Sequence, residues 1–168
     1  MTSERKVRIG ITVLIDKPSD SLFTNGIRQN VIILRDLFAK CKNVSESYII
    51  NTAKDVTIPT DGSSTWSPYA KHIISLEEAK EKCDLIVMAQ GSAHVSVYQE
   101  LVKKGIVITK HIMGAELNVF NETILFKDNK EARNLYSRNK DTVSNVWISP
   151  HFFETDRYFF ETQYDCEA

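Results

Sequence analysis

Four apolar, β-branched runs separated by helix-like segments constrain the fold of this chain more than any other feature. The runs are residues 7–15 (VRIGITVLI), 84–89 (DLIVMA), 106–112 (IVITKHI) and 143–149 (VSNVWIS). Near-continuous apolar strands are typical of a parallel sheet with helices on both faces. Residues 44–52 and 72–74 are two further strand candidates. Strands that alternate with helices predict a three-layer, Rossmann-like α/β sandwich with a mainly parallel sheet.

Helical patterns fill the segments between these runs. The first helix begins at Gly26, and its predicted sheet-facing stripe, widened by Ile33 and Leu37, consists of Ile27, Val31, Leu34, Phe38 and Cys41. The other side of this helix carries Arg28, Arg35, Asp36 and Lys40.

Three later helices are also predicted. A capping box formed by Ser75 and Glu78 opens a helix over residues 76–82. Another helix ends at Lys104, with Gly105 as its C-cap, and a short one covers residues 130–138. Residues 53–70 have no sustained period and form a long connection of the kind that is usually functional or mobile.

Length and composition fit one domain over residues 1–168. The chain has 42% hydrophobic and 26% charged residues and a formal net charge of −1. These values exclude disordered, collagen-like and coiled-coil chains, and give no general attraction to nucleic acid or anionic membranes. No run is long enough to span a bilayer or to act as a secretory signal. We therefore expect a cytoplasmic protein with no membrane span and no nucleic-acid partner.

Several kinds of site lack their sequence signature. Cys41, Cys83 and Cys166 form no C-x-x-C pair, so we expect reduced, mostly packed thiols and no zinc site. The glycine-rich dinucleotide fingerprint, the P-loop, the G-x-S-x-G elbow and the H-E-x-x-H motif are missing. We expect neither a metal nor a cofactor.

Ligands of open α/β sheets bind beyond the carboxyl ends of the strands, where the strand order reverses. That rule selects three segments of this chain, residues 16–30, 90–94 and 111–116. The ligand-binding residues predicted in them are Gly26, Gln29, Asn30, Gln90, Gly91, Ser92 and Gly114.

Asn30 and His111 each have two interpretations. Asn30 lies in the first turn of its helix, on the side predicted to face the sheet, where it either ties down residues 16–25 or contacts a polar ligand. His111 lies one residue before the end of an apolar strand, and is either a packing residue or a catalytic one.

The carboxyl-terminal segment is unusually aromatic. Residues 151–164 contain Phe152, Phe153, Tyr158, Phe159, Phe160 and Tyr164. A helix starting near Thr155, its predicted N-cap, would set Phe160 and Tyr164 on one face. Either this tail covers every ring against the last strand, or some rings form an exposed patch through which the chain forms a homodimer.

Together these segments resemble the amino-terminal half of GT-B type glycosyltransferases, most closely a family of bacterial and phage proteins assigned to that superfamily. The G-x-x-Q-N pattern of Gly26, Gln29 and Asn30 opens the first helix in that family. The segments KCDLIVMAQGS, IVITKHIMGAELNVFNETILF and VSNVWISPHFFETDRYFFETQYDC resemble its later strands and its connecting helix. The resemblance extends from Lys6 to Cys166.

This resemblance implies a retaining, nucleotide-sugar-dependent hexosyltransferase of which the chain is the acceptor-side half. His111 matches a histidine that lies near the transferred sugar in such enzymes, and it would be the catalytic residue. The donor-binding domain would follow residues 151–168, so we expect the chain to be inactive without a partner that supplies it. The alternatives are a non-catalytic module that binds a sugar or nucleotide, and an interaction protein that has lost the site.

Overall fold

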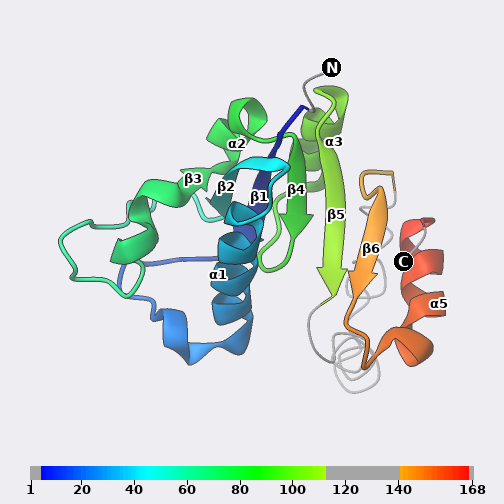
Figure 1. Ribbon diagram of the computed structural model, residues 1–168, viewed down its shortest axis with the longest axis horizontal. Helices are drawn as coiled ribbons and strands as arrows, with labels where there is room; N and C mark the ends of the chain where they lie inside the picture. The colour runs from blue at the N-terminus through cyan, green and yellow to red at the C-terminus, as the bar shows by residue number, and fades with distance from the viewer. Residues whose placement is uncertain (1–4, 113–140, 167–168) are drawn as a thin grey trace.

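The computed structural model describes residues 5–112 and 141–166 (Figure 1). The strands are β1 (Val7–Val13), β2 (Val44–Asn51), β3 (Ile73–Ser75), β4 (Leu85–Met88), β5 (Val107–Ile112) and β6 (Asn145–Ile148). The helices are α1 (Gly26–Ala39), α2 (Leu76–Lys82), α3 (Val95–Lys103) and α5 (Phe153–Tyr164), with the 3-10 helices η1 (Leu22–Thr24) and η2 (Ser67–His72). The helix predicted over residues 130–138 lies outside the described residues.

The strands form one six-stranded sheet in the order β3-β2-β1-β4-β5-β6, and every neighbouring pair is parallel. The order reverses between β1 and β4. All carboxyl ends therefore lie along one edge of the sheet, and the switch point of a doubly wound fold lies between β1 and β4. The predicted α/β class is confirmed.

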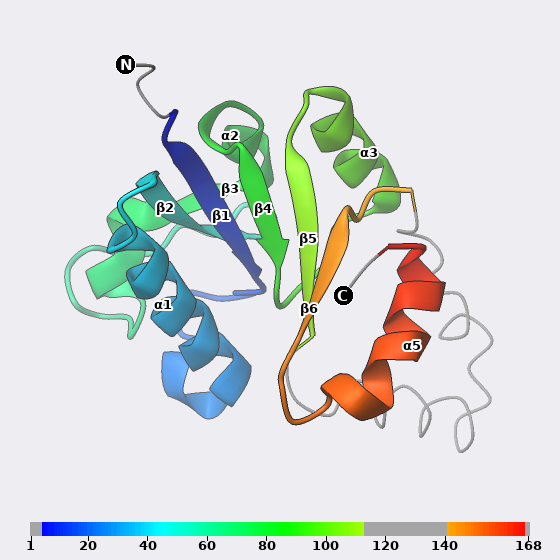
Figure 2. The ribbon, with the colours of Figure 1, turned by 45° about the vertical axis from the view of Figure 1, so that its right-hand side comes forward.

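Helices cover both faces of this sheet (Figure 2). One core lies between the sheet and α1, and it also contains Ile58 and Trp66 from the connection between β2 and β3. The other core contains side chains of α2, α3 and α5, among them Ala79, Tyr98 and Phe160. The result is the three-layer arrangement expected for strands that alternate with helices.

The rotation of α1 differs from the prediction. Val31 and Ile32 are buried, whereas Ile33 and Leu37 are 55% and 54% exposed and Cys41 is also exposed. Arg28 and Arg35, expected to face solvent, have side chains only 13% and 15% exposed. Their guanidinium groups donate to backbone carbonyls beside the helix, and their long stems pack as apolar groups. This packing rotates α1 so that its buried face contains Ile32 rather than Ile33.

The tail forms the helix α5, which begins two residues before the predicted start. Phe152 is the N-cap in place of Thr155, whose hydroxyl donates to the Phe152 carbonyl at 3.1 Å. Phe160 and Tyr164 are buried on one face, as predicted, while Tyr158 is 82% exposed. Hence the tail does not cover every ring. A homodimer through residues 151–168 stays a prediction.

Candidate functional site

The loop after β1 is fixed at the carboxyl edge by a buried amide. Asn51, the last residue of β2, accepts hydrogen bonds from the Ile15 and Ala53 backbone N–H groups at 3.0 and 3.2 Å. Its Nδ2 donates to the Ile15 carbonyl at 3.1 Å. Asn51 is 5% exposed, so these bonds satisfy a side chain that would otherwise be costly to bury. They join the ends of β1 and β2.

Arg28 holds the other end of the same loop. Its guanidinium donates to the carbonyls of Leu14 and Ser21, each at 3.1 Å, and forms an ion pair with Asp20 at 3.2 Å. The first turn of α1 is thereby tied to the end of β1. The Arg28 guanidinium therefore bonds to groups of the fold rather than to a ligand.

The long connection between β2 and β3 supports this loop. The Trp66 indole is fully buried and donates to the Asp20 carbonyl at 3.0 Å. Ser64 donates to the Pro18 carbonyl at 2.6 Å, and the Leu22 N–H donates to Thr65 Oγ1 at 2.8 Å. The sequence pattern predicts that this connection is functional or mobile. Residues 64–66 of the connection are instead packed against the loop after β1 and support it.

The turn after β4 packs tightly against the ends of β1 and β2. The Ala89 N–H donates to Thr12 Oγ1 at 3.0 Å, and the Gln90 N–H donates to the Thr12 carbonyl at 3.1 Å. Gly91 then adopts φ +74°, and a Cβ at this position would lie 2.3 Å from Thr52 Oγ1. Only glycine allows both this backbone conformation and this close approach.

The predicted ligand residues lie in separate parts of this edge. Gly26, Gln29 and Asn30 are exposed in the first turn of α1, and Gln90, Gly91 and Ser92 form the turn after β4. Gly114 lies outside the described residues. The prediction that Asn30 faces the sheet is wrong, because the burial of Arg28 and Ile32 turns Asn30 toward solvent. The grouping of these residues around one ligand stays a prediction.

His111 lies beside an aromatic side chain of the next strand. It is in register with Trp147 of β6, and their ring centroids are 6.3 Å apart in an edge-on arrangement. Trp147 also contacts Phe38 of α1, with centroids 6.3 Å apart. Thr109 and Asn145, one pleat earlier on the same face, are also in register. Their side-chain oxygens are buried without a hydrogen-bond partner among the described residues.

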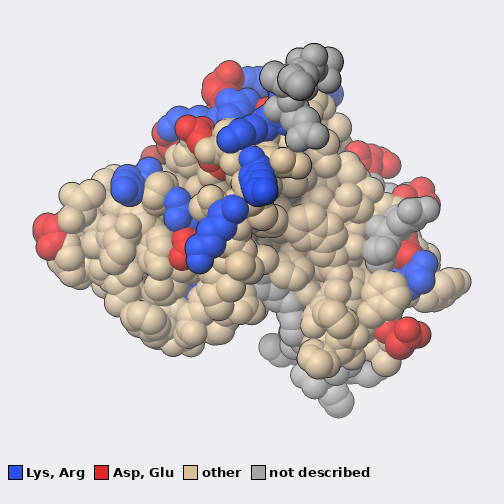
Figure 3. Space-filling model, in the orientation of Figure 1, with Lys and Arg blue, Asp and Glu red and all other residues tan. Residues whose placement is uncertain are grey.

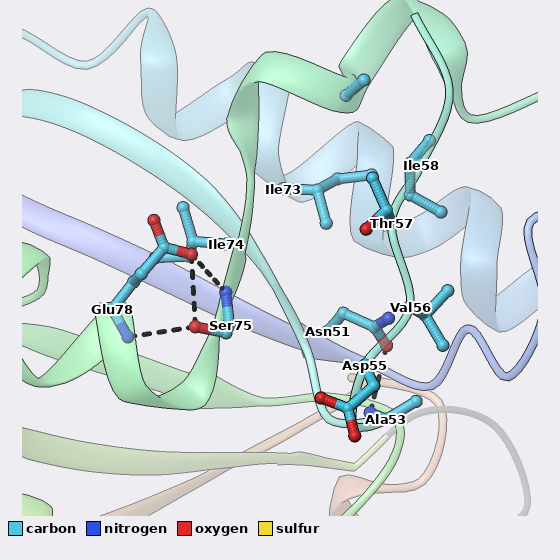
Figure 4. A pocket seen from close by; sticks show the side chains of 11 residues that line it. Asn51, Ala53, Asp55, Val56, Thr57, Ile58, Ile73, Ile74, Ser75 and Glu78 are labelled. Atoms are coloured by element: carbon cyan, nitrogen blue, oxygen red, sulfur yellow. Dashed lines mark hydrogen bonds between the residues drawn. The ribbon is translucent and has the colours of Figure 1, made fainter.

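Two cavities lie at the carboxyl ends of β2 and β3. The larger, of about 670 Å³, lies between the segment after β2 and the start of α3, and its lining includes Lys54, Ser92, His94 and Val97. The smaller, of about 580 Å³, has β3 and the first turn of α2 on one side and residues 55–58 on the other (Figure 4).

Two helix starts border these cavities. The predicted capping box is confirmed, since the Glu78 N–H donates to Ser75 Oγ and the Ser75 N–H donates to the Glu78 carboxylate. Lys82 and these bonds hold the pKa of Glu78 below its usual value. His94 caps α3 by accepting from the Ser96 N–H at Nδ1, at 3.3 Å. The neutral ring then carries its proton on Nε2, where it can donate to a ligand.

On one face of the molecule, charged side chains gather toward the amino edge of the sheet (Figure 3). On the face seen in Figure 3, most Lys, Arg, Asp and Glu side chains lie toward the top, over the amino ends of the strands. There Arg8 forms an ion pair with Asp84 at 3.0 Å and lowers its pKa to about 2. Residues 21–34, from η1 through most of α1, contain one charged side chain, the largely buried Arg28.

A family model described as a protein of unknown function (DUF2827) matches residues 9–168. The chain belongs to the DUF2827 family. No curated protein gives a significant match to it. The description of the family assigns no activity, so the function of this DUF2827 chain has to be argued from its site.

Sequence reasoning selected residues 90–94, of which Ser92 and His94 line the larger cavity, but it did not identify Lys54, Asp55 and Ser75 as cavity residues of the DUF2827 chain. The capping box marked Ser75 as a helix start, but nothing in the pattern indicated that residues 53–58 lie opposite it. Asp55 has φ +58°, a left-handed conformation that a sequence pattern does not reveal outside turn motifs.

Other predicted properties of the DUF2827 chain concern its cysteines and its helices. Cys83 is buried, and burial raises the pKa of its thiol to about 12, so it is a packing residue and no nucleophile. Cys41 is exposed, contrary to the expectation of mostly packed thiols, because it lies past the end of α1 on its outer side. Among residues 5–112 and 141–166, no helix is long and apolar enough to cross a membrane, and no cluster of three potential metal ligands is found.

Proposed function

We propose that this chain is the acceptor-side half of a nucleotide-sugar-dependent glycosyltransferase of the GT-B type, with His111 beside the reacting sugar. The doubly wound sheet and its switch point support this proposal, because such sheets bind ligands at the carboxyl edge. The resemblance of residues 6–166 to amino-terminal halves of these enzymes supports it as well. The chain would bind and orient a sugar and would take no cofactor of its own.

The pairing of His111 with Trp147 is the observation that carries the proposal. An imidazole can donate a hydrogen bond to a sugar hydroxyl or accept one from it, and an indole ring offers apolar contact to the C–H face of a sugar. Both rings lie at the carboxyl ends of neighbouring strands.

The distribution of charge supports the acceptor side rather than the donor side. A leaving nucleoside diphosphate needs cationic groups or other donors that stabilise its developing charge. In residues 21–30, from η1 through the first turn of α1, the single cation is Arg28, which is already bonded to Asp20 and two carbonyls. An uncharged surface fits a neutral sugar. The diphosphate would have to be bound by another domain.

His111 would act by orientation. A hydrogen bond from its ring to a hydroxyl of the sugar would fix the angle at which the acceptor oxygen approaches, and such positioning lowers the entropic part of the barrier. The chain itself contributes no group that we assign to the stabilisation of the leaving group. We therefore expect binding of sugars by this chain and no transfer by the chain alone.

Fluorescence titration with neutral hexoses tests the proposal. Binding near His111 should change the emission of Trp147 saturably, and His111→Ala should weaken that binding by about tenfold. His72→Ala is the matched control, since His72 is also half-buried but precedes β3, at the amino edge of the sheet. Equal affinity in wild type and His111→Ala would contradict the proposal.

A further inference from the structure

We infer that the two cavities at the carboxyl ends of β2 and β3 form one binding site for a neutral sugar, contacted by Lys54 and Asp55. This inference rests on the proposed function, because it assigns the seat of the acceptor sugar in that reaction. It places the acceptor at Lys54 and Asp55, two residues that the sequence did not indicate, whereas His111 and Trp147 would contact the transferred sugar.

The two cavities adjoin. Both are lined by Asn51, Ala53, Asp55 and Ser75. Their volumes of about 580 and 670 Å³ each lie in the range of small-molecule sites. Asn51 makes their floor rigid, because its side chain is bonded to both Ile15 and Ala53. A ligand the size of one or two sugar rings would fit without rearrangement of this floor.

Two of the charged residues that line the cavities are neutralised by ion pairs within the fold. One cation and one anion of the lining form no such pair with the described residues and therefore remain free to contact a ligand. Four charged residues line the cavities, and two of them, Glu77 and Glu78, form ion pairs with Lys80 at 2.9 Å and Lys82 at 2.8 Å. The other two, Lys54 and Asp55, form no hydrogen bond or ion pair through their side chains with any part of the chain that the structure describes. An ammonium group and a carboxylate in one cavity can bond to many hydroxyls of a neutral ligand.

The lining also excludes competing classes of ligand. Phe, Tyr, Trp and Arg are missing from the residues that line either cavity, so a phosphate finds no bidentate donor and a nucleobase could stack only on the imidazole of His94. The carboxylate of Asp55 would oppose the binding of a nucleoside diphosphate. Ser92 and the Nε2 of His94 offer hydroxyl and N–H groups that suit a polyol.

Asp55 allows a test that does not endanger folding. Its φ of +58° is a conformation that favours glycine, so Asp55→Gly removes the carboxylate and relieves backbone strain. Asp165→Gly is the matched control. Asp165 is also exposed, has φ +55°, and follows α5, far along the chain from the cavities.

The experiment is an amide NMR titration of wild type and both variants with glucose, galactose, maltose and lactose, and with UDP as the anionic probe. We expect at least one neutral sugar to shift the amides of residues 54, 55, 92 and 97. Asp55→Gly should weaken that binding by about tenfold or more, and Asp165→Gly should leave it unchanged. Unchanged affinity in Asp55→Gly, no sugar-induced shift at these amides, or tighter binding of UDP than of the sugars there would overturn the inference.

The same titration separates this inference from the proposed function. Shifts at residues 54, 55, 92 and 97 report on the cavities, whereas shifts at residues 110–112 and 147 report on the surroundings of His111. If only the second set responds, the cavity inference fails and the proposed function stands. If only the first set responds, and His111→Ala has no effect on any sugar, the cavities bind sugar but the role of His111 fails.

Discussion

Gly91 lies against Thr52 so closely that a Cβ on Gly91 would lie 2.3 Å from the threonine Oγ1. The same Cβ would lie 3.0 Å from the Cβ of Leu14. The turn after β4 therefore meets the ends of both β1 and β2 at the switch point. Thr52 is itself held in place, since its hydroxyl donates to the Val13 carbonyl at 3.1 Å.

Gly91→Ala should destabilise the fold by about 2–4 kcal/mol, because the variant adds a steric overlap to an unfavourable left-handed backbone. Gly62→Ala is the control, since Gly62 has φ +88° but a Cβ there would meet no described atom within 4 Å. It should cost only about 1 kcal/mol, from the backbone conformation alone. Urea unfolding measures both. Equal losses in the two variants would show that the contact with Thr52 is unimportant.

Asn51→Ala should lower the free energy of unfolding by about 2–4 kcal/mol. It leaves the N–H and carbonyl groups of Ile15 without their buried partners. Asn43→Ala, in an exposed turn, should change the stability by less than about 0.5 kcal/mol, and urea unfolding again compares the two. A loss in Asn51→Ala as small as that of the control would argue against the amide as the clamp between β1 and β2.

Acid should weaken the fold through Asp84. Its folded-state pKa of about 2 lies below the ordinary value of 3.8, chiefly because the Arg8 guanidinium and N–H donate to its carboxylate. A depressed carboxyl pKa stabilises the fold above the unfolded value, so this contribution is complete above about pH 5 and is lost as the pH falls toward 2. Asp84 is 21% exposed, which limits the contribution to about 1–2 kcal/mol.

Thermal unfolding of Asp84→Asn and wild type between pH 2 and pH 7 tests this contribution. The two proteins should differ most at neutral pH and converge near pH 2. Asp16→Asn is the control, because Asp16 is exposed, and it should follow the wild-type profile. A constant difference between Asp84→Asn and wild type across this range would contradict the pKa argument.

The sheet and the helix starts could be predicted because their signals are local. Continuous apolar runs marked β1, β4, β5 and β6, and the Ser75 capping box marked the start of α2. The strand order, and with it the switch point between β1 and β4, comes from the structure, because alternation alone does not fix the order of the strands. The strand ends, and with them the edge that contains His111 and Gly91, could be located to within one or two residues.

The side chains that form the cavities could not be predicted, because tertiary packing decides them. Arg28 and Arg35 count as polar in any pattern, but their stems are buried and rotate α1, so Asn30 faces solvent. Residues 53–58 are held by the bond from the Ala53 N–H to Asn51 and by Ile58, which is buried in the same core as Trp66, and no periodicity reveals these contacts. Asp55 therefore gave no signal in the sequence.

The chain alone should not release nucleoside diphosphate from nucleotide sugars above the uncatalysed rate. The reason is that Arg28, the single cation of residues 21–34, is already bonded within the fold, and that Lys54 lies in a cavity that also contains the carboxylate of Asp55. A coupled assay for nucleoside diphosphate, run with UDP-glucose and UDP-galactose, measures this. Release that is well above background and is abolished by His111→Ala would contradict the assignment of this chain to the acceptor side.

A sugar bound beside His111 should shift the imidazole NMR resonances of that residue. A titration with a neutral hexose tests this, and the resonances of His72 are followed in the same samples as the control. Burial lowers the pKa of His72, so its ring can be followed as the neutral species near pH 8. We expect the His111 resonances to shift saturably with the sugar while those of His72 stay in place. A His111 ring that does not respond to any hexose, or that moves in parallel with His72, would contradict a sugar site beside His111.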